Sequence, residues 1–199
     1  DWENFQFSPD GSRVLYRADQ DTDEVWELYS VPAAGGRPVK LNAELTSGGD
    51  LDENGFRFSP DGSRVLYHAD QDADEVDELY SVPATGGTPV KLNSALPLGG
   101  DVDWSGIQFN PDGSRVLYRA DQDTNNVNEL YSVPAMGGTP VKLNSALPPD
   151  GDVGSFQLSP DGSRVLYLAE QDTDNVFELY SVPAMGGTPV KLNSALPSG

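Results

Sequence analysis

Short stretches that are rich in apolar residues and separated by polar turns recur along the whole chain. The first set of such stretches is Phe5–Phe7 with its neighbours, about Arg13–Ala18, Val25–Val31 and Pro38–Leu41. Their length, and their content of aromatic and β-branched residues, predict β-strands. Between the first two strands, Pro9-Asp10-Gly11 predicts a tight turn, because proline presets φ and glycine adopts the left-handed conformation.

The same set of stretches occurs four times. The turn aspartates repeat with spacings of 51, 51 and 49 residues, at Asp10, Asp61, Asp112 and Asp161. The run Glu-Leu-Tyr-Ser-Val-Pro-Ala follows each turn, beginning at Glu27, Glu78, Glu129 and Glu178. We therefore divide the chain into one array of four units, at about 1–51, 52–102, 103–151 and 152–199.

A period near 50 residues with four short strands per unit is typical of β-propellers. A single four-stranded sheet could not bury both of its apolar faces, whereas stacked sheets cover one another. The sequence thus predicts an all-β fold, a β-propeller built from four four-stranded antiparallel blades.

The units also resemble a known family. Phe-Ser-Pro-Asp-Gly-Ser-Arg-Val-Leu-Tyr, Glu-Leu-Tyr-Ser-Val-Pro-Ala and Gly-Gly-x-Pro-Val-Lys-Leu are similar to the TolB-type (WD-like) propeller repeat, over essentially the whole chain. Relatives include periplasmic adaptor proteins and the propeller domains of prolyl-oligopeptidase-type peptidases, usually with six to eight blades. The resemblance implies the fold and a periplasmic or extracellular location, and it says little about function.

Four blades leave an uncovered sheet face at each end of the array. Closing four blades into a ring requires about 90° per blade, at the lower limit of the usual ~4–8 blades. Two chains joined head to tail require only about 45° per blade, and each junction would repeat the packing inside the chain. We therefore expect a homodimer with eight blades; a four-bladed monomer and a fragment of a longer chain are the alternatives.

The net charge of the chain excludes some classes of binding partner. The chain has 32 acidic and 12 basic residues, a net charge of −20, which repels nucleic acid and anionic membrane surfaces. No apolar run approaches the ~18 residues of a membrane span. There is no cysteine, so disulfides and thiolate sites are excluded. The expected partners are a second copy or another protein, and neither nucleic acid nor a membrane.

Carboxylates concentrate in the predicted hairpins between the second and third strands. Spaced Asp residues suggest a calcium site, because this ion prefers several carboxylate oxygens, although the spacing is not that of an EF-hand. The candidate ligands are Asp19, Asp21, Asp23, Asp70, Asp72, Asp74, Asp121, Asp123, Asp172 and Asp174. The alternative is a set of solvated turns with diffuse counterions and no cofactor.

The same hairpins predict cross-strand neighbours. A turn at Asp21-Thr22 would place Arg17 opposite Trp26 and Tyr16 opposite Glu27, and in the second unit it would place His68 opposite Asp77. His68 is the single histidine, and its position holds arginine or leucine in the other units, which favours packing over catalysis.

We therefore interpret the chain as a non-catalytic scaffold for protein–protein interaction or self-assembly. It could be a half-propeller or a recently amplified or engineered repeat block, since the last two units share a run of 13 identical residues from Met to Pro. The alternative function is binding of a sugar or a cation by the acidic loops.

Overall fold

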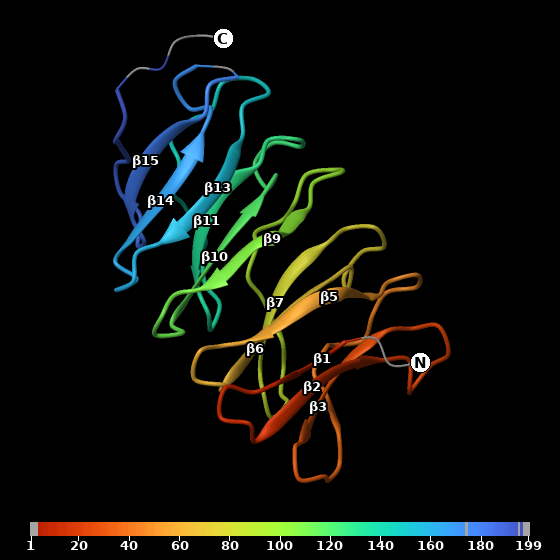
Figure 1. The fold of residues 1–199 in the computed structure, drawn as a ribbon. Coiled ribbons are helices and arrows are strands. Elements are labelled where there is room, and N and C mark those ends of the chain that lie inside the picture. Colours follow the sequence, from red (N-terminus) through yellow and green to blue (C-terminus); the bar gives the residue numbers. More distant parts are fainter. Residues whose placement is uncertain (1–3, 174, 195, 197–199) are drawn as a thin grey trace. The chain divides into compact units, whose positions relative to one another are not determined.

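The computed structural model describes residues 4–173, 175–194 and 196, and within these it contains sixteen β-strands and no helix. None of the described segments could therefore cross a membrane as an apolar helix. The chain divides into two compact units, residues 1–92 and 93–199, and each unit contains two four-stranded antiparallel sheets (Figure 1). The four predicted blades are thus present.

The first unit contains the first two blades, in which sequential strands are neighbours. The strands of the first blade are β1 (Phe5–Phe7), β2 (Arg13–Ala18), β3 (Glu27–Pro32) and β4 (Val39–Lys40). The strands of the second blade are β5 (Leu51–Phe58), β6 (Arg64–Ala69), β7 (Glu78–Pro83) and β8 (Val90–Lys91).

The second unit repeats this order. The strands of the third blade are β9 (Val102–Phe109), β10 (Arg115–Ala120), β11 (Glu129–Pro134) and β12 (Val141–Lys142). The strands of the fourth blade are β13 (Val153–Leu158), β14 (Arg164–Ala169), β15 (Glu178–Pro183) and β16 (Val190–Lys191).

The predicted register of the hairpin between β2 and β3 is wrong by two residues. Tyr16 lies opposite Tyr29 rather than Glu27, and Arg17 lies opposite Leu28 rather than Trp26. In the second blade, His68 likewise lies opposite Leu79. The turn is wider than two residues, because Glu24 adopts a left-handed conformation with φ 63° and β3 begins only at Glu27.

The two-residue shift keeps each side chain on its predicted face, because side chains alternate between faces with a period of two. The predicted neighbours therefore remain diagonal contacts. The Arg17 guanidinium lies 4.2 Å from the centroid of the Trp26 ring. The corrected register also creates stacked tyrosine pairs, with ring centroids 5.1–5.4 Å apart in all four blades.

The core of each unit lies between its two blades. One sheet face, which we call the leucine face, is formed in the first blade by Leu15, Leu28 and Leu41. The opposite face, which we call the aromatic face, is formed in the second blade by Phe56, Phe58, Val65, Tyr67, Tyr80 and Val82. These two faces make one buried cluster, and the corresponding faces of the third and fourth blades make another.

The turn aspartates stabilise the tight turns that the sequence predicts. The carboxylate of Asp10 accepts hydrogen bonds from the Ser8 hydroxyl at 2.6 Å and from the backbone N–H of Ser12 at 3.0 Å. These bonds lower the pKa of Asp10 to about 2, and the equivalent bonds do the same for Asp61 and Asp161. The ionised carboxylates thus hold the turns that connect the first two strands of the blades.

This lowered pKa predicts acid sensitivity. A carboxylate with a depressed folded-state pKa stabilises the fold above its unfolded pKa near 3.8, and the effect is lost as pH falls toward about 2. We expect a variant with Asp10→Asn, Asp61→Asn and Asp161→Asn to be less stable than the wild type at pH 5 in urea unfolding, and the difference to shrink between pH 4 and pH 2. A difference that does not change with pH would contradict the turn assignment.

Candidate functional site

The first carboxylate of the hairpin holds backbone in place in the second, third and fourth blades. Asp70 accepts the backbone N–H groups of Asp50 and Glu75, and Asp121 accepts those of Asp101 and Asn126. In the fourth blade, Glu170 accepts the N–H of Asp152 at 3.1 Å. These side chains tie the hairpin to the segment that enters the blade. Asp19 occupies the equivalent position in the first blade.

The second carboxylate of each hairpin pairs with a lysine from the last strand of the same blade. The pairs are Asp21 with Lys40, Asp72 with Lys91, Asp123 with Lys142 and Asp172 with Lys191, at 2.6–3.5 Å. Each lysine also pairs with a buried glutamate at 2.5–2.7 Å, namely Glu27, Glu78, Glu129 and Glu178. Each of these glutamates accepts a hydrogen bond from a tyrosine hydroxyl.

The remaining candidate ligands do not join these groups. Asp23 and Asp74 are exposed, and the Asp74 carboxylate lies beside Gly48 of the preceding loop. Asp174 lies outside the described residues. The first and second carboxylates of the second, third and fourth hairpins thus have separate protein partners, and the group of three closely spaced ligand atoms found in the described chain lies elsewhere. The calcium site stays a prediction.

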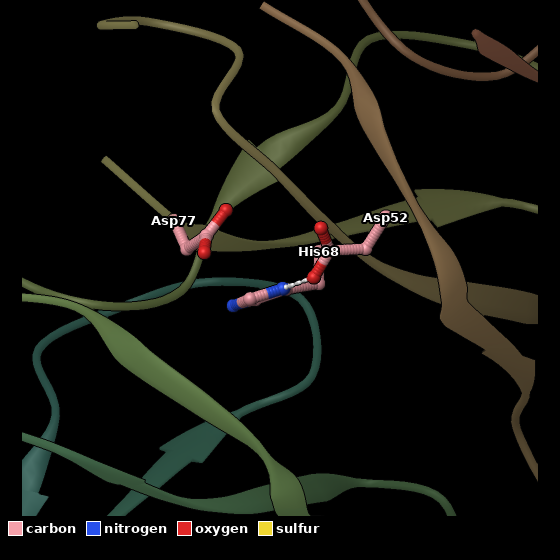
Figure 2. Close-up of side chains that lie close together, drawn as sticks. All are labelled: Asp52, His68 and Asp77. Atoms are coloured by element: carbon pink, nitrogen blue, oxygen red, sulfur yellow. Dashed lines mark hydrogen bonds and ion pairs between the residues drawn. The ribbon is translucent and has the colours of Figure 1, made fainter. Parts of the chain in front are cut away.

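That group consists of Asp52, His68 and Asp77 in the second blade (Figure 2). Asp52 belongs to β5, His68 to β6, and Asp77 directly precedes β7. Their ligand atoms lie within 4.8 Å of one another, His68 is 3% exposed, and its Nδ1 is hydrogen-bonded to the Asp52 carboxylate. An imidazole nitrogen and two carboxylate oxygens are ligand types that zinc accepts.

The equivalent position in other blades explains this group without a metal. In the third blade Arg119 pairs with Asp103, and in the first blade Arg17 donates to the Leu51 carbonyl oxygen at 2.7 Å. In these two blades an arginine thus connects strands at this point, and in the second blade the hydrogen bond between His68 and Asp52 does the same. The proximity of His68 and Asp77 was predicted from the sequence. The sequence analysis did not identify Asp52 as a neighbour of His68. The equivalent residues of the third blade, Asp103 and Arg119, carry opposite charges and could have indicated it.

The aromatic face of the first blade is uncovered. Phe5 and Phe7 are 72% and 62% exposed, whereas the equivalent Phe56 and Phe58 of the second blade are each 8% exposed. This face borders an open hollow of about 540 Å³. The lining of the hollow is almost entirely apolar and includes Phe5, Val14, Tyr16, Val31 and Pro38.

The leucine face of the fourth blade is uncovered as well. Leu166 and Leu192 are 38% and 52% exposed, whereas the equivalent Leu117 and Leu143 of the third blade are completely buried. We call the aromatic face of the first blade and the leucine face of the fourth blade the two end faces. Both end faces expose apolar side chains whose equivalents inside each unit are buried.

Comparison with known proteins supports the architecture. No protein-family model and no curated protein matches the sequence. Among solved structures, a TolB protein from Agrobacterium tumefaciens matches with a TM-score of 0.56 and 18% identity, over 94% of this chain and 63% of that chain. TolB from Acinetobacter baumannii matches with a TM-score of 0.53 and 16% identity, over 96% of this chain and 43% of that chain.

The fold is also similar to that of a peptidase. Dipeptidyl peptidase 4 from Porphyromonas gingivalis matches with a TM-score of 0.67 and 11% identity, over 96% of this chain and 32% of that chain. The chain therefore spans less than two thirds of the length of each of these proteins. At these identities the likeness concerns the fold, and the chain has the fold of a TolB-type β-propeller repeat array.

Proposed function

We propose that this chain is a non-catalytic β-propeller scaffold that acts in protein–protein interaction through its two end faces. The observation that carries this proposal is the exposure of Phe5 and Phe7 at one end and of Leu166 and Leu192 at the other. Contiguous exposed apolar patches mark interaction surfaces, because a soluble protein rarely leaves several hundred Å² of such surface in water.

The composition of the end faces suits a protein partner. Phenylalanine and tyrosine are enriched at the buried centres of interfaces, where they contribute large contact areas. Charged residues are depleted at such centres, and the hollow beside Phe5 is lined by apolar side chains, glycine and proline. In the two end blades, the lysine of the last strand pairs with a hairpin carboxylate, Lys40 with Asp21 and Lys191 with Asp172.

The expected roles of the ionisable residues support a scaffold over an enzyme. His68 is buried against Asp52, and the hairpin carboxylates accept backbone N–H groups or pair with lysines. Each of these interactions stabilises a blade. These structural roles support a function at the surfaces of the blades.

A photo-crosslinking experiment tests this proposal. A photoreactive amino acid is placed at Phe7, at Leu192 and, as a control, at Leu98, which is 99% exposed but lies in a loop. The purified chain is irradiated alone and with added cell extract. We expect protein cross-links from the two end-face positions and few from Leu98. Equal cross-linking at all three positions, or none, would contradict a role for the end faces.

A second hollow favours the alternative function of binding a sugar or a cation. It has a volume of about 570 Å³ and lies in the first blade, between the hairpin and the loop that leads to the second blade. Its polar lining includes Glu24, Glu27, Lys40, Glu44 and Asp50. Calcium titration followed by thermal melting separates the two functions, because a bound ligand raises the melting temperature with its concentration. For the scaffold we expect no saturable shift, and an unchanged fold in excess chelator.

A further inference from the structure

We propose that the end faces bind each other between two copies of the chain, with the first blade of one copy against the fourth blade of the other. This inference rests on the proposed function and identifies its partner as a second copy. A contact of the same kind already occurs inside each unit. In each case, the leucine face of one blade packs against the aromatic face of the next.

The two uncovered faces are complementary halves of that contact. Leu15, Leu28 and Leu41 of the first blade are completely buried against the aromatic face of the second. Their equivalents Leu166, Leu179 and Leu192 in the fourth blade retain exposed surface. The aromatic face that would cover them is the one that the first blade leaves in water. A second copy therefore supplies each end face with the surface that its equivalents already contact.

A close contact at the edge of the blades shows the same complementarity. In each unit, a valine of the earlier blade lies so near a glycine of the later blade that an added Cβ would be 2.5–2.6 Å from its Cγ1. The two contacts are those of Val39 with Gly86 and of Val141 with Gly186. The equivalent Gly35 in the first blade has no atom within 4 Å of that position. Gly35 thus provides the space for Val190 of the partner subunit.

A polar contact repeats in the same way. The Gln71 side-chain oxygen accepts the backbone N–H of Ala43 from the preceding blade at 2.9 Å. The Gln171 oxygen likewise accepts the N–H of Ser145 at 2.8 Å. Gln20 is the equivalent residue of the first blade. Its side-chain oxygen accepts a hydrogen bond from the Tyr16 hydroxyl, as the oxygens of Gln71 and Gln171 do from the tyrosines of their own blades. Its oxygen is placed to accept the N–H of Ser194 of the partner subunit.

The contact area is in the range of a specific interface. A blade face of four strands, each about five residues long, measures about 17 Å by 14 Å. A pair joined at both ends would cover four such faces, about 950 Å² in projection, and the relief of the side chains adds to this area, which is close to the roughly 1,000 Å² of a small specific interface.

Light scattering with complementary variants tests the pairing. Phe7→Asp disables the first-blade face, and Leu192→Asp disables the fourth-blade face. Both residues are exposed within a single chain, so each variant should keep its circular dichroism spectrum. We expect the wild type to have twice the mass of one 21.3 kDa chain at micromolar concentration. Each variant alone should be a monomer, with a dissociation constant raised about 100-fold or more by the buried charge.

Light scattering of a mixture of the two variants is the decisive measurement. A head-to-tail contact predicts that the mixture associates one to one through its single intact junction, more weakly than the wild type, although neither variant associates alone. If Phe7→Asp alone still dimerises, the faces pair like with like and the inference is wrong. A monomeric wild type whose end faces cross-link to a different protein would overturn the inference and leave the proposed function standing. A monomeric wild type without such cross-links would overturn both.

Cysteine cross-linking checks the residue-level geometry independently. The chain contains no cysteine, so Gln20→Cys combined with Ser194→Cys introduces one defined pair. We expect a short bismaleimide to link two chains through these positions. The control combines Gln20→Cys with Leu98→Cys, which lies in the loop before β9. Equal yields from both pairs would contradict the proposed contact.

Discussion

Replacing Phe58 with alanine should lower the free energy of unfolding by about 3–5 kcal/mol, the range for truncating a buried aromatic side chain. Phe58 is 8% exposed and belongs to the buried cluster between the first two blades, together with Leu15 and Leu28. Its removal leaves a cavity, because strands on both sides are fixed by their sheet hydrogen bonds. Urea unfolding monitored by circular dichroism measures the change.

Two further substitutions delimit this prediction. Leu98→Ala removes a side chain that is 99% exposed, and its cost should stay within about 0.5 kcal/mol. Phe7→Ala changes the residue equivalent to Phe58, and in dilute monomer its cost should also be small, because Phe7 is 62% exposed there. A loss at Phe58 no larger than that at Leu98 would show that the blades do not pack as described.

Replacing Glu78 with alanine should be the second most damaging change, at about 1.5–3 kcal/mol, the range for hydrogen bonds to a charged group. The buried Glu78 carboxylate accepts the Tyr80 hydroxyl at 2.8 Å and pairs with Lys91 at 2.6 Å. Burial, followed by the hydrogen bond to Glu78, raises the pKa of Tyr80, so this hydroxyl remains a donor. Without the carboxylate, Tyr80 keeps a buried hydroxyl that lacks this acceptor.

Asp72→Ala is the matched control, because Asp72 pairs with the same lysine from an exposed position. Exposed ion pairs contribute about 0–1 kcal/mol, so its cost should fall well below that of Glu78→Ala. The same urea series measures both variants. Equal costs would mean that burial does not set the strength of these contacts, and would contradict a structural role for the Glu78 network.

Local sequence determined the elements of the blades. The strands predicted around Phe5–Phe7 and at about Arg13–Ala18 correspond to β1 and β2, and the turn at Asp10 forms as expected. These features depend on neighbours within a few positions, namely alternating apolar residues, a proline and a glycine. The repetition of such features then determined the number of sheets and, through the resemblance to TolB-type repeats, their architecture.

Contacts between residues far apart in the chain were decided only by the tertiary structure. The hairpin register shifted by two residues because Glu24 adopts a left-handed conformation, which its residue type does not indicate. The pairing of His68 with Asp52 depends on how β5 aligns with β6, where the register is interrupted between Leu51 and Phe56. Four nearly identical units also predict four equal environments. Only packing makes Phe58 buried and Phe7 exposed, because burial depends on whether a neighbouring blade covers the face, and that neighbour is not encoded in the repeat itself.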